Sequence, residues 1–190
     1  MKNFYFILFA VALVTAMTAA KATTVIPPSF DQLVLQAEVI FQGSVTDVRS
    51  QWVGEGAQRH IVSDITFHIE DGIKGTPGQA YTVRMYGGTV GADSMGISDA
   101  PTFKVGDRDI LFVENNGTQA VPLVGIMHGR FREQTDSSGQ EVVMRNAGEP
   151  VKDVAQLGRD PEGTAPNSAE PNLTARDFKA AVRTKLQSTQ

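Results

Sequence analysis

The stretch that decides the fold runs from residue 60 to residue 69 and has the sequence HIVSDITFHI. Apolar and polar side chains alternate along it with a period of two, which is typical of a β-strand with one buried face. The apolar positions on that face are Ile61, Ile65, Phe67 and Ile69. Residues 80–86 repeat the alternation, and the continuous apolar run at 109–113 predicts a strand buried on both sides.

The segments next to this stretch add further strands. Residues 38–53 predict a long strand whose apolar face switches beyond Asp47, which indicates a bulge, and Gly43 within it indicates close approach of a neighbouring backbone. Residues 126–133 and 140–145 predict a hairpin. Residues 73–78 and the glycine-rich stretch 87–106 are expected to be loops.

Two helices are expected to flank the strands. Ser29 can cap the first, with Gln32 at the reciprocal position of a capping box, and this helix should end at Ala37 or Glu38. Thr174 can cap the second, over residues 173–186. The pattern predicts a mainly β fold, a five- to six-stranded antiparallel OB-like barrel with a short N-terminal helix and a C-terminal helix. The expected divisions are a signal peptide at 1–22, the barrel at 23–148, a flexible linker at 149–171 and the C-terminal helix at 172–190.

The order of these motifs carries a family resemblance. The motifs are AEVIFQGSV at 37–45, ITFHI at 65–69 closed by IKG at 73–75, YTV at 81–83, and FKVGDRDILFV at 103–113. They resemble the netrin module and the tissue inhibitors of metalloproteinases, and also bacterial secreted proteins with the same strand and Val-Gly-Asp pattern. The match covers residues 29–115 and implies an OB-fold that contacts a protease. The animal inhibitors use a disulfide-fixed N-terminal cysteine, whereas this chain has no cysteine.

The first 22 residues predict export. Lys2 precedes an apolar run from Phe4 to Ala16, and small residues then precede a cleavage point before Thr23, with the Ala20/Lys21 bond as the alternative. The run is shorter than the ~20 residues of a membrane-spanning helix, so no membrane span is expected after cleavage. Export without cysteines points to a bacterial periplasmic or secreted protein.

Charge argues against nucleic acid as a partner. The whole chain has a formal net charge of −4, which becomes −6 once Lys2 and Lys21 are removed with the signal peptide. Such a surface repels phosphate backbones. The local stripe of His128, Arg130 and Arg132 is expected to pair with Glu133 and Glu141 across the hairpin.

Catalytic and metal chemistry find little support in the sequence. His60 and His68 lie eight residues apart on one strand, so roughly 26 Å separates them and they cannot share a metal. The chain has no nucleophile elbow, and its carboxylate pairs are adjacent or two residues apart. We therefore predict no catalytic residue, no metal and no cofactor.

These inferences predict an exported, non-catalytic binding module. Its partner is expected to be an exported protein, with a protease as one candidate. The expected contact residues are Thr23, Thr24 and Val25 at the mature N-terminus and Asp93, Ser94, Met95 and Ile97 at a loop tip. Two alternatives stay open: a metal-dependent hydrolase, and a structural component of the cell envelope attached through the terminal helix.

Overall fold

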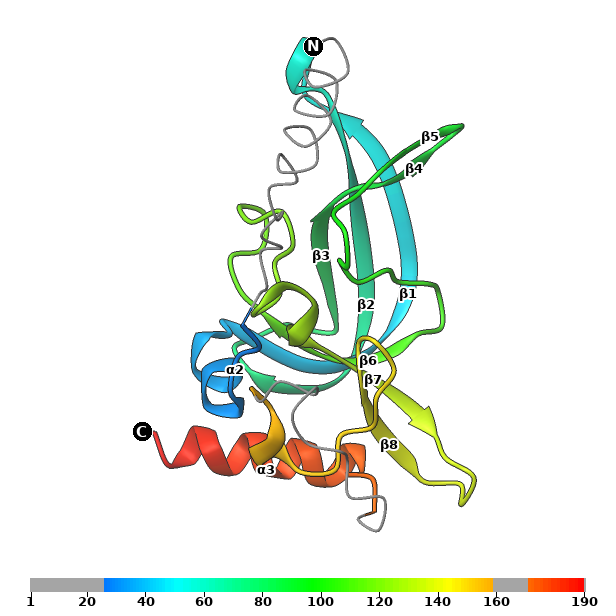
Figure 1. Ribbon diagram of the computed structural model, residues 1–190. Coiled ribbons are helices and arrows are strands. Elements are labelled where there is room, and N and C mark those ends of the chain that lie inside the picture. Colours follow the sequence, from blue (N-terminus) through cyan, green and yellow to red (C-terminus); the bar gives the residue numbers. More distant parts are fainter. Residues whose placement is uncertain (1–25, 159–170, 190) are drawn as a thin grey trace, which may run out of the picture.

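The computed structural model describes residues 26–158 and 171–189. One antiparallel sheet has the strand order β3-β2-β1-β6-β7-β8, a two-stranded hairpin stands beside it, and two α-helices pack at one end (Figure 1). The large sheet contains β1 (Val39–Val53), β2 (His60–Lys74), β3 (Ala80–Tyr86), β6 (Arg108–Val113), β7 (Arg130–Thr135) and β8 (Glu141–Arg145). The hairpin contains β4 (Gly88–Val90) and β5 (Asp93–Met95), and the helices are α2 (Phe30–Gln36) and α3 (Ala175–Gln187).

The fold is mainly β and the sheet is antiparallel as predicted, but the expected closed barrel is wrong. Strands β3 and β8 are the two edges of the sheet and do not pair with each other. A loop covers the β3 edge instead. The side chain of Asn116 accepts a hydrogen bond from the backbone N–H of Arg84 at 3.0 Å and donates to the carbonyl of Thr82 at 2.8 Å. The N–H of Tyr86 donates to the carbonyl of Ala120.

The β8 edge is covered by the segment that follows it. The N–H of Val143 donates to the carbonyl of Leu173, and the N–H of Val151 donates back to Val143. Arg145 likewise donates to the carbonyl of Glu149 through its backbone N–H. Because loops satisfy the edge groups on both sides, the sheet does not need to close on itself.

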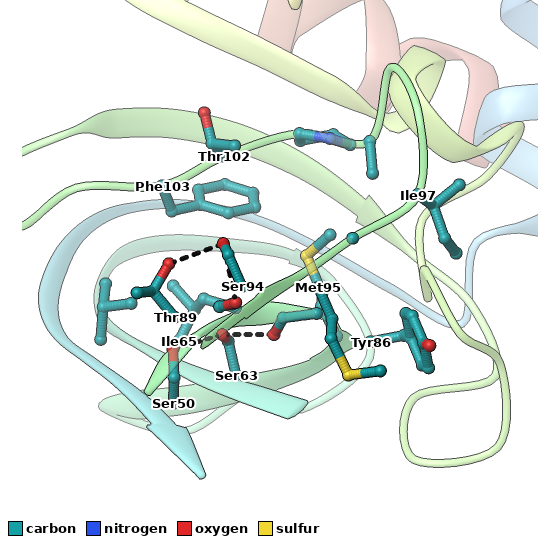
Figure 2. A pocket seen from close by; sticks show the side chains of 17 residues that line it. Ser50, Ser63, Ile65, Tyr86, Thr89, Ser94, Met95, Ile97, Thr102 and Phe103 are labelled. Atoms are coloured by element: carbon teal, nitrogen blue, oxygen red, sulfur yellow. Dashed lines mark hydrogen bonds between the residues drawn. The ribbon is translucent and has the colours of Figure 1, made fainter. Parts of the chain in front are cut away.

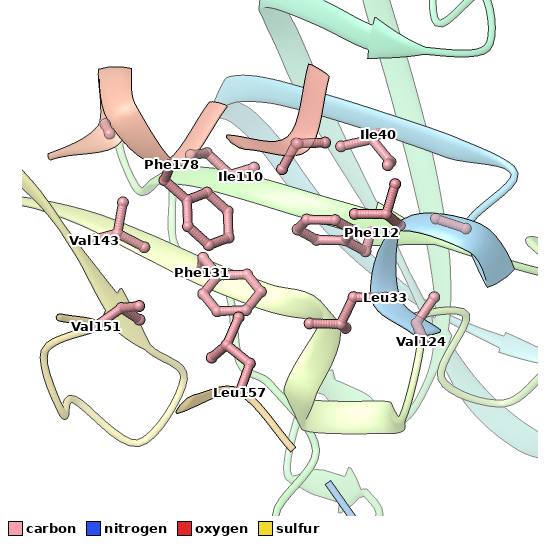
Figure 3. Close-up of a cluster of buried hydrophobic side chains, with 14 residues drawn as sticks. Leu33, Ile40, Ile110, Phe112, Val124, Phe131, Val143, Val151, Leu157 and Phe178 are labelled. Carbon is pink, nitrogen blue, oxygen red and sulfur yellow. The ribbon is translucent and has the colours of Figure 1, made fainter. Parts of the chain in front are cut away.

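The sheet carries a hydrophobic core on each of its faces. The core facing the helices contains Ile40, Ile110 and Phe112, and Figure 3 shows Phe131 facing Phe178 of α3 at its centre. The core on the opposite face contains the alternate residues Phe41 of β1 and Leu111 and Val113 of β6, together with Phe67 of β2 and Val83 of β3. Strand β6 is therefore buried on both sides, as its unbroken apolar run predicted.

Helix α2 begins and ends as its sequence requires. Ser29 accepts a hydrogen bond from the N–H of Gln32 at 3.2 Å, and the Gln32 side chain accepts from the N–H of Ser29 at 2.8 Å, which completes the predicted capping box. At the other end, Lys74 of β2 donates to the carbonyls of Val34 and Leu35. A cation at a helix C-terminus satisfies orphan carbonyls and favours the helix dipole.

Both irregularities predicted for β1 are present. Its register against β2 shifts between Val45 and Asp47, which is the position where the apolar face was expected to switch. Gly43 lies between β2 and β6. A Cβ atom at Gly43 would lie 2.5 Å from the carbonyl oxygen of His68, so only glycine allows this spacing.

We expect the substitution Gly43→Ala to lower the free energy of unfolding by about 1–3 kcal/mol, because the new methyl group must displace a strand backbone. Urea denaturation measures this change. Gly96→Ala is the matched control, since a Cβ added at Gly96 would meet no atom within 4 Å, and it should change stability by less than about 0.5 kcal/mol. Equal effects of the two substitutions would contradict the packing argument.

The C-terminal helix is part of the core facing the helices. Phe178 and Val182 of α3 are fully buried, and Lys179 and Arg183 pair with Asp71 of β2. Within the segment expected to be a flexible linker, residues 149–158 are packed: Val151 and Leu157 are buried in the same core as α3. Residues 159–170 lie outside the described part of the chain.

Three other segments differ from the sequence-based expectation. Strand β2 continues to Lys74 instead of ending at Ile69. The glycine-rich stretch expected to be irregular contains β4 and β5, and residues 126–129, expected to be strand, form a 3-10 helix. Among the described residues, no helix has the length and hydropathy needed to cross a membrane.

Candidate functional site

A cleft of about 370 Å³ lies between the β4–β5 hairpin and the inner strands of the sheet (Figure 2). The chain leaves β3 through Gly87 and Gly88, both of which have positive φ angles. A Cβ at Gly88 would lie 2.2 Å from the hydroxyl of Ser63 and 2.4 Å from that of Ser50. Glycine at this position therefore lets the hairpin lie close over β1 and β2.

The walls of the cleft combine apolar groups with hydroxyls. Its apolar lining includes Val48, Ile65, Met85 and Phe103. Figure 2 shows Phe103 on one side, opposite Ser63 and Ile65 of β2. The ring of Phe103 packs edge-to-face against Phe67 with 5.6 Å between centroids, which fixes its orientation.

Four serine and threonine hydroxyl groups in the cleft, those of Ser50, Ser63, Thr89 and Ser94, bond to one another or to backbone carbonyls. The hydroxyl oxygens of Ser50 and Ser63 are 2.8 Å apart, and the Ser63 hydroxyl donates to the carbonyl of Gly87 at 2.7 Å. The hydroxyl oxygens of Thr89 and Ser94 are hydrogen-bonded at 3.0 Å. Among the described residues that line the cleft, none is charged and none is a histidine. A serine nucleophile needs an adjacent base, and this lining does not provide one.

Three of the seven predicted contact residues line this cleft: Ser94, Met95 and Ile97. Ile97 is 40% exposed and Met95 is 36% exposed, although both are apolar. The sulfur of Met95 accepts a hydrogen bond from the N–H of Ile61, which attaches β5 to β2. Asp93 lies exposed at the start of β5 and is not part of the lining. The predicted residues Thr23, Thr24 and Val25 lie outside the described residues.

A wider groove of about 990 Å³ adjoins the cleft. The two recesses share Ile97, Ala100 and Thr102. The groove continues past Ile126 and Met127, which lie on the 3-10 helix before β7. A ligand that fills the cleft can therefore extend along the groove without leaving the surface.

The loop between the two recesses is held by a buried ion cluster, and here the pairing expected from the sequence is wrong. Arg130 is 3% exposed and does not pair with Glu133 or Glu141. It donates to Asp109 at 2.8 Å, to Asp107 at 2.8 Å and to the carbonyl of Thr102 at 2.6 Å. Its guanidinium also lies 4.1 Å from the ring centroid of Phe103. We call these residues, Arg130, Asp107 and Asp109, the Arg130 clamp.

Burial and the charge of Arg130 have opposite effects on the pKa of Asp109 in the Arg130 clamp. Burial raises the pKa of Asp109, and the hydrogen bonds and charge of Arg130 oppose that rise without cancelling it. Glu133 and Glu141 pair with Arg108 of β6 instead. Burial also raises the pKa of Glu133, while a hydrogen bond from Gln42 acts in the opposite direction.

The histidines are separated, as the sequence predicted. His60 stacks on Tyr86 with 5.4 Å between ring centroids, and His68 is exposed. His128 is half-buried, and its pKa is lowered by burial and by the charge of Arg145. Within residues 26–158 and 171–189, no group of three or more His, Asp or Glu side chains is placed to hold a metal ion.

Comparisons with known proteins give no relative from which a function can be transferred. No protein-family model matches the chain. Searches of curated proteins and of solved structures also found no match.

Proposed function

We propose that the protein is a non-catalytic binding module that takes an uncharged, largely apolar segment of a partner protein into the cleft under β4–β5. The lining described above supports binding, because apolar walls with a few hydroxyls recognise a neutral group and offer no activated acid, base or nucleophile. The adjoining groove gives the partner segment room to continue past Ile97.

The observation that carries this proposal is the position of Ile97. It is an exposed aliphatic residue that lines both recesses, and it lies in the loop that leads to Phe103. The Arg130 clamp fixes this loop through the carbonyl of Thr102. A loop that is ordered before binding loses less conformational entropy in the complex, which favours affinity.

The partner we propose is an exported protein, because the first 22 residues have the composition of a signal peptide. The resemblance to the netrin module favours a protease among such partners and an OB-type ancestry for the sheet.

The envelope alternative is less favoured, since the apolar side of α3 is occupied: Phe178 and Val182 contact the protein's own core. The hydrolase alternative lacks a set of facing acids or imidazoles in the described residues.

Photo-crosslinking tests the location of the binding surface. A photoreactive phenylalanine analogue at position 97 should form an adduct with a specific partner in the producing cell. The same analogue at position 105 should not, although Val105 is also an exposed aliphatic residue, at 66%, because it does not line the cleft. Adducts of equal yield at both positions, or none at position 97, would argue against the proposal.

Once the partner is purified, we expect Ile97→Asp to weaken binding at least tenfold. Burying an isoleucine side chain contributes about 1.5–3 kcal/mol, and a carboxylate in its place must be desolvated without a cation to pair with. Isothermal titration calorimetry measures the Kd. Val105→Asp adds the same charge to the same loop outside the cleft and should change the Kd less than twofold.

A further inference from the structure

A separate hollow of about 150 Å³ lies between the N-terminal segment, α2 and the end of β8. Its apolar lining includes Pro28, Leu33, Phe131 and Leu157, and Figure 3 shows Leu33 and Leu157 beside Phe131. A buried cavity of about 150 Å³ accommodates one benzene ring. The hollow is therefore the size of a small ring or a short branched chain.

One residue in this lining is a cation without an ion-pair partner among the described residues. Arg145, at the end of β8, lines the hollow, and within the described part of the chain it makes one side-chain hydrogen bond, to the carbonyl of Gln156 at 3.3 Å. It forms no ion pair with any carboxylate of the described residues. Burial lowers the pKa of Arg145, and the charge of Glu149 only partly opposes this. An arginine remains charged in a protein, and Arg145 is partly exposed, so its remaining N–H donors are open to solvent and to a ligand at the edge of the hollow.

The other ionisable groups in the lining do not neutralise Arg145. Arg130 is engaged by Asp107 and Asp109. The lowered pKa of His128 keeps its imidazole neutral near pH 7. Glu149 is exposed; its charge acts on Arg145, but the two side chains form no ion pair. The lining therefore combines apolar side chains with Arg145, which has no ion pair among the described residues, and Glu149 is the one carboxylate that lines the hollow.

We propose that this hollow binds a carboxylate carried on an apolar group, with Arg145 as its ion-pair partner. A planar guanidinium binds a carboxylate through two parallel hydrogen bonds, and the apolar body of the ligand would contact Leu33, Phe131 and Leu157. The same chemistry is offered by a free carboxylic acid and by the apolar C-terminal residue of a peptide. This site is distinct from the cleft under β4–β5, so it does not depend on the function proposed above.

Titration of the full chain with benzoate, followed by backbone amide NMR, tests the site. Benzoate should shift the resonances of Leu33, Phe131, Arg145 and Leu157 and bind at least tenfold more tightly than benzamide, which has the same shape without the charge. N-Acetylleucine and N-acetyl-Gly-Gly-Leu, each compared with its amide, distinguish a free carboxylic acid from a peptide C-terminus as the source of the carboxylate. Tighter binding of the tripeptide acid than of N-acetylleucine identifies a peptide C-terminus, and equal or weaker binding of the tripeptide acid identifies a free carboxylate.

Two variants test whether the side chain of Arg145 accounts for the preference for benzoate over benzamide. Arg145→Gln should weaken benzoate binding at least tenfold and leave benzamide binding within twofold. Arg176→Gln removes an exposed cation of α3 and should change neither. If the wild type binds benzoate and benzamide equally, or if neither shifts the four resonances up to about 20 mM, the proposal is overturned whether or not Arg145→Gln folds. Unchanged benzoate affinity in Arg145→Gln would overturn it as well.

Discussion

Replacement of Arg130 by methionine should lower the free energy of unfolding by about 3–5 kcal/mol, because it removes one partner of a buried ion cluster and leaves Asp109 charged and unpaired. Asp109 is fully buried, and Arg130 is its only ion-pair partner among the described residues. Urea denaturation at pH 7 measures the loss. Arg176→Met, which removes an exposed arginine of α3 that has no ion pair among the described residues, should cost less than about 0.5 kcal/mol.

The pH dependence of this loss has a definite sign. Without Arg130, the pKa of Asp109 in the folded state rises further above its unfolded value, so the folded state takes up the proton at a higher pH than the unfolded state does. The deficit is complete above the folded pKa and shrinks as the pH falls toward about 3.9, the ordinary value for aspartate. Asp109→Asn combined with Arg130→Met should recover part of the loss at pH 7. A deficit that is independent of pH would mean that packing, and not charge, accounts for it.

Replacement of Phe178 by alanine should have an effect of similar size, about 3–5 kcal/mol. The ring is fully buried and contacts the rings of Phe131, Phe112 and Phe30, with centroids 4.7, 6.1 and 6.3 Å away. Thermal or urea unfolding measures the change. Leu35→Ala, in which the leucine is 48% exposed, is the control and should cost less than about 1 kcal/mol.

The Phe178 experiment also reports whether α3 folds with the sheet. Trp52 of β1 is the single tryptophan of the chain, so its fluorescence follows the sheet while far-ultraviolet circular dichroism follows the helices. We expect both signals to change in one transition in wild type and variant alike, which is the test for two-state unfolding. Loss of helical signal at a lower urea concentration than the tryptophan signal would show that α3 behaves as a separate unit.

Features determined by local sequence were predictable. The capping box of Ser29 and Gln32, the limits of β3 and the bulge near Asp47 each depend on residues close together in the chain. The close backbone contact at Gly43 was also anticipated, because glycine inside an alternating strand often marks a place where another backbone approaches closely. In all four, a short-range pattern is sufficient to specify the geometry.

Features that depend on distant parts of the chain were not predictable. The β4–β5 hairpin has strands of three residues without alternation, so nothing in its sequence separates it from a loop. Arg130 resembles any surface arginine until the fold places Asp107 and Asp109 beside it. The open sheet was missed because its edges are covered by Asn116 and Leu173, which are remote in sequence from the strands they protect.

The part of the candidate site that was predictable is its apolar tip. Met95 and Ile97 were identified because apolar side chains beside glycines are unusual in a loop. The opposite wall, formed by Phe103 with Ile65 and Met85, was missed, since each of these residues alone looks like ordinary core. A recess between two chain segments has no signature in either segment taken separately.

The covered edges of the sheet have a consequence for behaviour at high concentration. Bare strand edges are where β proteins join into fibrils, and Asn116 and Leu173 occupy those positions on β3 and β8. Replacing Asn116 with alanine would free the N–H of Arg84 and the carbonyl of Thr82 for another molecule. We therefore expect the Asn116 variant to self-associate more readily than the wild type, an effect unrelated to any ligand.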